Sequence, residues 1–151
     1  MRVVTPPASS AAVVLTALTL LFLARVVGQV LVVFVGVAWL PPVESWYSGL
    51  LPYPVLLPAQ LVILAAQAVL DRAAWTGRAW LLRPRPDAAR RLRWFSYLYA
   101  LAMAVRWAVT GTHGIPVVFH WVLAAYLYTL AGLWRPAAEP SASRTPLAAA
   151  R

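Results

Sequence analysis

The sequence contains no cysteine, no lysine and only four acidic residues, and each of these shortages excludes a class of protein. Without cysteine, the chain has no disulfide, no thiolate nucleophile and no cysteine-ligated metal or iron–sulfur centre. No two acidic residues lie close together in the sequence, which removes the paired carboxylates that usually hold Mg²⁺ in enzymes. The Gly-Xaa-Ser-Xaa-Gly, HExxH and P-loop motifs are also missing. We therefore predict no metal site, and we favour a binding or structural role over an enzyme.

Charged residues of either sign are scarce as well, at 11% of the 151 residues, whereas hydrophobic residues make up 62%. A typical soluble domain has about 25% charged and about 45–50% apolar residues. The mean hydropathy of +0.73 points in the same direction. So few charges cannot cover a soluble domain of this size, and the chain is too apolar to be disordered. The composition therefore predicts an integral membrane protein.

Four apolar stretches are long enough to cross the roughly 30 Å hydrocarbon core of a bilayer as helices. They cover residues of about 11–40, 53–71, 94–112 and 115–134. We predict an all-α, polytopic membrane protein whose four transmembrane helices form an up-down bundle within residues 1–136. The remaining tail, 137–151, is rich in Ala, Ser and Pro and is predicted to be disordered.

The positions of the arginines predict the orientation. All 13 basic residues are arginine, and seven of them lie between residues 72 and 93. Cytoplasmic loops carry the excess of positive charge, so this loop and both termini are predicted to be cytoplasmic. The arginines lie between apolar segments rather than within a soluble recognition motif, so we predict no nucleic-acid partner. The alanine-rich, all-arginine composition favours a bacterial inner (plasma) membrane protein.

The first apolar segment and the segment after it allow more than one interpretation. Thirty helical residues would measure about 45 Å, so the helix is either tilted or broken between Arg25 and Gln29. No small-residue cleavage pattern ends the stretch, so we expect an uncleaved signal anchor. The following residues, 41–54, contain four prolines and could be an interfacial connector or a lid over a site that opens outward.

Polar residues recur at helical spacing in each predicted span, which places them on one face of each helix. A central arginine costs about 2.5–3.5 kcal/mol on insertion scales, so such residues are candidates for function. Simpler interpretations remain open. The glutamines could only hydrogen-bond neighbouring helices, Arg106 could extend to the headgroups, and His113 could only cap a turn.

Two arginines lie within spans, and no acidic residue is predicted at a comparable depth. A cation in a low dielectric needs an anion, water or a carbonyl cluster beside it. We therefore predict an anion-accepting site for a lipid phosphate, a carboxylate, a quinone oxygen or a haem propionate. Its candidate residues are Arg25, Gln29, Gln60, Gln67, Tyr99, Arg106, His113 and His120.

These residues favour a protein that binds an anionic lipid-like ligand, or an accessory subunit of a membrane complex. Its partners would be membrane lipids and either further copies of the chain or a larger complex; no cofactor is predicted. One alternative is a redox subunit with b-type haem or quinone. The two histidines are seven residues apart, about 10.5 Å along a helix, and cannot bind opposite faces of one haem. A lipid-modifying enzyme with a histidine base beside Arg106 is the other alternative.

Overall fold

The computed structural model describes residues 10–46, 52–77, 80–111 and 114–134, and all regular structure within them is helical. This confirms the predicted all-α class. His113 and the tail 137–151 lie outside the described residues. The long helices are α1 (Ser10–Val30), α2 (Tyr53–Thr76), α3 (Pro86–Thr110) and α4 (Ile115–Leu133). Two short helices follow α1: the π-helix η1 (Leu31–Val35) and the 3₁₀-helix η2 (Val43–Trp46).

Three helical segments are long and apolar enough to cross a membrane, namely Ser10–Val35, Tyr53–Thr76 and Ile115–Leu133. Even the shortest, with 19 residues, measures about 28 Å at about 1.5 Å per residue. These helices agree with a membrane-embedded protein. Helix α3 has 25 residues but does not belong to this group, because arginines near both of its ends lower its apolar character.

The first apolar segment forms a continuous helix that ends earlier than the sequence indicated. The chain is helical through both Arg25 and Gln29, so the break considered there is absent. Helix α1 instead widens into η1 and ends at Gly36, whose φ of 67° lies in the left-handed region. Glycine adopts this conformation without the clash that a Cβ atom would cause, and it is a common helix terminator. The helical segment therefore ends at Val35 rather than near residue 40.

The arginine-rich region between the second and third predicted spans is more helical than expected. Helix α2 continues to Thr76, and α3 starts at Pro86, eight residues before the predicted boundary at 94. Proline fits the first position of a helix because no amide donor is needed there, and Asp87 in the first turn complements the helix dipole. These two residues explain the early start of α3.

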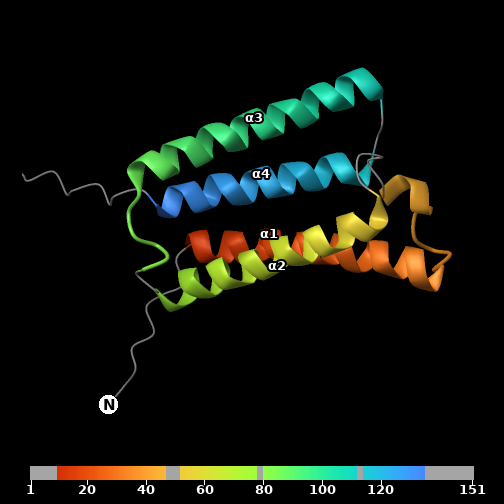
Figure 1. Ribbon diagram of the computed structural model, residues 1–151, viewed down its shortest axis with the longest axis horizontal. Helices are drawn as coiled ribbons and strands as arrows, with labels where there is room; N and C mark the ends of the chain where they lie inside the picture. The colour runs from red at the N-terminus through yellow and green to blue at the C-terminus, as the bar shows by residue number, and fades with distance from the viewer. Residues whose placement is uncertain (1–9, 47–51, 78–79, 112–113, 135–151) are drawn as a thin grey trace, which may run out of the picture.

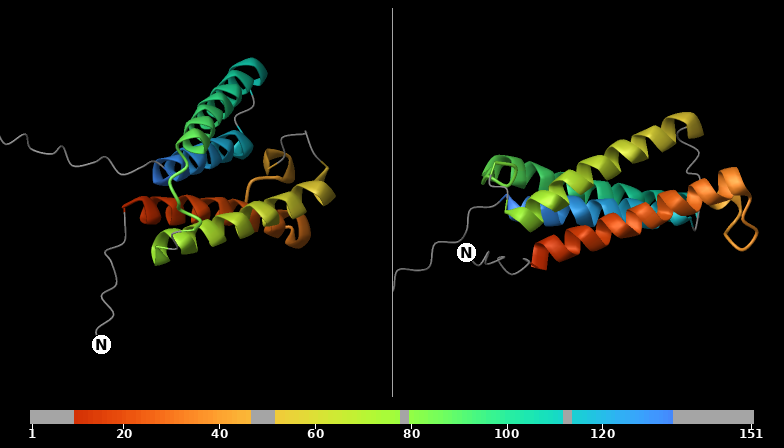
Figure 2. Two further views of the ribbon diagram at one scale, coloured as in Figure 1. Left: turned by 60° about the vertical axis from the view of Figure 1, so that its left-hand side comes forward. Right: turned by 90° about the horizontal axis from the view of Figure 1, so that it is seen from below.

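Helices α1 and α4 lie side by side in the centre of the molecule, with α2 packed against α1 and α3 packed against α4 (Figure 1). The two further views show the same neighbours (Figure 2). An apolar core of Leu15, Tyr126 and Leu130 lies at the end where α1 begins and α4 ends. At this end Trp75 Nε1 also donates a 2.8 Å hydrogen bond to Thr16 Oγ1, which joins α2 to α1. The opposite end contains the polar residues described next.

Candidate functional site

Arg25 lies within the apolar length of α1 and is only 6% exposed. Its guanidinium donates to two neutral acceptors, from Nη1 to Gln29 Oε1 at 3.3 Å and from Nη2 to the Trp46 carbonyl at 3.4 Å. Its Cζ lies 5.7 Å from the ring centroid of Phe119 on α4, which is a cation–π distance. Within the described part of the chain, no carboxylate forms an ion pair with Arg25. Neutral dipoles and one aromatic ring therefore surround a buried positive charge.

Two buried glutamines connect α1 to α2 beside this arginine. Gln29 Oε1 accepts from Gln60 Nε2 at 3.1 Å in addition to its bond from Arg25. Because Gln29 Oε1 accepts both hydrogen bonds, the orientation of the Gln29 amide is fixed and its nitrogen remains able to donate. Among the described residues, Arg25 Nε, Gln29 Nε2 and Gln60 Oε1 are buried without a hydrogen-bond partner. A buried polar group in this state costs about 1–3 kcal/mol, so two donors and one acceptor are available to a polar ligand.

A cavity of about 180 Å³ adjoins these groups. All four long helices contribute to its wall, which combines polar with apolar side chains. The lining residues are Arg25, Gln60, Tyr99 and His120 together with Phe22, Leu56, Ala59, Ile63, Phe119 and Leu123. Since a water molecule occupies about 30 Å³ in the liquid, the cavity has room for a carboxylate or a phosphate group.

His120 and Tyr99 form the side of the cavity that is contributed by α4 and α3. The His120 Nδ1–H donates to the carbonyl of Pro116, so a neutral imidazole has an unprotonated Nε2 that can accept a hydrogen bond. The Tyr99 and His120 ring centroids are 5.7 Å apart, with the rings tilted by 56°.

Trp46 is part of this arrangement, which the sequence did not reveal. Trp46 is only 6% exposed, whereas Trp39 is 81% exposed. The Trp46 indole packs against Gly28, where an added Cβ would lie 2.5 Å from its Cη2 atom. Its backbone carbonyl accepts from Arg25, so η2 folds over the site. The only sequence signal for this contact is Gly28, three residues after Arg25.

Two of the other candidate residues, Gln67 and Arg106, do not line this cavity. Gln67 is buried near the opposite end, where the Tyr126 hydroxyl donates to Asp71 Oδ1 at 3.0 Å and lies 3.3 Å from the Gln67 carbonyl. Arg106 is half-buried and is not among the residues lining the cavity. The structure thus brings together five of the eight candidates: Arg25, Gln29, Gln60, Tyr99 and His120.

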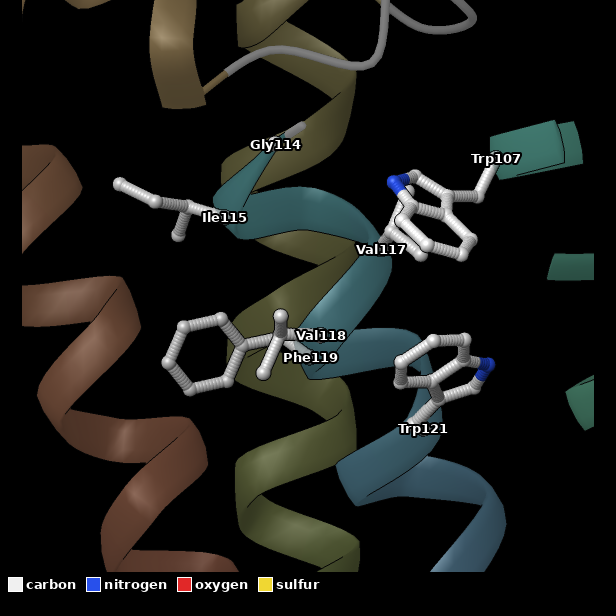
Figure 3. Close-up of a pocket in the computed structure, with 7 residues that line it drawn as sticks. All are labelled: Trp107, Gly114, Ile115, Val117, Val118, Phe119 and Trp121. Atoms are coloured by element: carbon white, nitrogen blue, oxygen red, sulfur yellow. The ribbon is translucent and has the colours of Figure 1, made fainter. Parts of the chain in front are cut away.

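A larger apolar pocket of about 460 Å³ lies beside the start of α4. Figure 3 shows Trp107 of α3 and Trp121 of α4 on one side of α4, while Phe119 points to the other side, toward α1. Phe119 lines both this pocket and the 180 Å³ cavity. The polar site is therefore adjacent to an apolar space that could hold a hydrocarbon group.

Comparison with protein-family models, curated proteins and solved structures gives no significant match to the chain. A functional assignment therefore depends on the geometry and chemistry of the site.

Proposed function

We propose that this chain binds an anionic amphiphile, with the acidic head group beside Arg25 and the apolar part in the neighbouring pocket. The observation that carries the proposal is the buried Arg25 guanidinium, which has neutral acceptors, an unpartnered Nε–H and an adjoining cavity. An anionic oxygen would supply both the missing hydrogen-bond acceptor and the missing negative charge.

The surrounding groups favour a carboxylate or phosphate head. A guanidinium presents several N–H donors in one plane, which matches the two oxygens of such a group. Gln60 lines the cavity, and its unpartnered Oε1 can accept from a hydroxyl or a protonated acid. The apolar pocket next to Phe119 distinguishes a lipid-like ligand from a small water-soluble anion.

Purification in mild detergent, followed by mass spectrometry of co-purifying small molecules and an optical spectrum, tests this function. We expect a retained acidic lipid, such as a phospholipid, a fatty acid or an isoprenoid phosphate. A Soret band would overturn the proposal in favour of a haem-binding redox subunit. A folded preparation without any retained ligand would also contradict it and would leave a role as an accessory subunit of a membrane complex.

We also propose that all four long helices span the membrane as an up-down bundle. Helix α3 is the span that its composition alone does not identify. Helix α3 packs along α4, and Arg90, Arg91 and Arg93 all lie near its start, where they can reach the cytoplasmic headgroups. The long helix would otherwise have to lie outside the bilayer while its neighbour crossed it. We place the protein in a bacterial inner membrane with both termini in the cytoplasm.

Reporter fusions after Ser48, after Asp87 and at the C-terminus should read outside, inside and inside. The C-terminal fusion is the decisive one, because a protein with only three spans would place that end on the outer side. A fusion at Asp87 that reads outside would contradict the orientation given by the arginines.

A further inference from the structure

A second apolar groove, of about 370 Å³, lies between α1, α3 and α4. Val14 and Leu18 of α1 form one wall, and Ala100, Ala125 and Tyr128 of α3 and α4 form the other. The side chains of Val14 and Tyr128 are half-exposed, so the groove opens to the surroundings of the protein. In a membrane-embedded chain these surroundings are lipid acyl chains.

A cation lies next to this groove, against the ring of Tyr128, which lines it. The Arg93 Cζ lies 5.2 Å from the ring centroid of Tyr128, and Ser96, which lines the groove, donates a 2.7 Å hydrogen bond to the Arg93 carbonyl. The Arg93 Nε is buried and has no hydrogen-bond partner among the described residues. An apolar groove beside an arginine with an unpartnered donor suits a hydrocarbon chain attached to an anionic group.

The charges near Arg93 also select for an anion. Arg85, Arg90 and Arg91 lie on the same first turns of α3 or just before them. The one acidic residue in this stretch is Asp87, and it already forms an exposed ion pair with Arg90 at 3.1 Å. The groove end is therefore strongly positive, as expected where a protein contacts anionic headgroups.

We propose that this groove binds an acyl chain of an anionic phospholipid whose phosphate is held by Arg93. The groove is displaced from the Arg25 cavity toward the start of α1 and has no lining residue in common with it, whereas Trp121 lines both the groove and the 460 Å³ pocket. The proposal depends on Arg93 and not on Arg25, so different variants test the two proposals. It requires only that the chain is embedded in a membrane.

The test compares lipid binding to the detergent-purified full chain by native mass spectrometry, with phosphatidylglycerol and phosphatidylcholine of identical chains. We expect the parent protein to bind phosphatidylglycerol about tenfold more tightly. Arg93→Gln should lose most of this preference, whereas Arg90→Gln should keep it. Both variants remove one positive charge from the same helix, but Arg90 is exposed and faces Asp87 rather than the groove.

A second variant tests the hydrocarbon part of the proposal without changing any charge. Ala125 is exposed and lines the groove, so Ala125→Phe should fill the groove and weaken binding of both lipids. Inorganic phosphate should not compete with phosphatidylglycerol, because it has no acyl chain. Equal losses in Arg93→Gln and Arg90→Gln, equal binding of the two lipids, or full competition by phosphate would overturn the proposal.

Discussion

Replacing Arg25 with leucine should abolish retention of the anionic amphiphile, while the helices remain assembled. The substitution removes the only cation that lines the 180 Å³ cavity among the described residues. A hydrogen bond to a charged group contributes about 1.5–3 kcal/mol, and about 1.4 kcal/mol corresponds to a tenfold change in affinity. Loss of a two-point contact should therefore weaken binding by at least about 100-fold, measured as ligand retained per mole of purified protein.

Arg25→Lys and Arg90→Leu make this experiment specific. Lysine keeps the charge but loses the planar arrangement of donors, so we expect binding that is about tenfold weaker than in the parent. Arg90→Leu removes an exposed charge far from the cavity and should retain the ligand fully. Ligand retention at the parental level in a folded Arg25→Leu protein would contradict the proposed function.

Replacing Gly28 with alanine should destabilise the protein, although alanine is normally the better residue in a helix. The added Cβ would lie 2.5 Å from Trp46 Cη2, so the indole must leave its position on α1. Overpacking of this kind costs about 1–3 kcal/mol. We expect a lower thermal midpoint in detergent and weaker ligand retention, because the Trp46 carbonyl that binds Arg25 moves with the side chain.

Gly132→Ala is the matched control for this change. Gly132 is also helical, but an added Cβ there has no neighbouring atom within 4 Å, so the thermal midpoint of the Gly132→Ala variant should stay the same or rise.

A double variant tests the contact itself. Trp46→Ala is destabilising on its own because it leaves a cavity. Adding Gly28→Ala to Trp46→Ala should not lower the thermal midpoint any further, because the indole that clashes with the added Cβ is no longer present. Additive losses in the double variant would show that Gly28 acts through something other than Trp46.

The helical class and the burial of polar residues on one face of α1 and of α2 could be predicted from the sequence because both depend on periodicity. Arg25 and Gln29 are four residues apart, and so are Gln67 and Asp71, and the structure buries both pairs on one face of their helices. Spacing along one helix does not determine the depth at which two helices meet. For that reason the sequence grouped Gln67 with Arg25, whereas the structure places it beside Tyr126 at the other end.

The contacts made by the segment after α1 could not be predicted because they depend on backbone conformation. Its prolines and tryptophans suit both an interfacial connector and a lid. The π-helix, the left-handed Gly36 and the 3₁₀-helix together return Trp46 to Gly28, and none of these features has a periodic sequence signal. The apolar pattern covers only part of α3, because arginines occupy the first turns of the helix that Pro86 begins.

The central position of α1 and α4 has a consequence for how the protein is made. The helices nearest in sequence, α1 with α2 and α3 with α4, contact each other and can pair as they leave the ribosome. Contact between α1 and α4 requires the first and the last of the four long helices described, so it forms only after synthesis of α4. Until then, Arg25 lacks Phe119, and the cavity lacks His120. An incomplete chain would therefore leave Arg25 with only its Gln29 and Trp46 acceptors, without the aromatic ring and the cavity wall that α4 supplies.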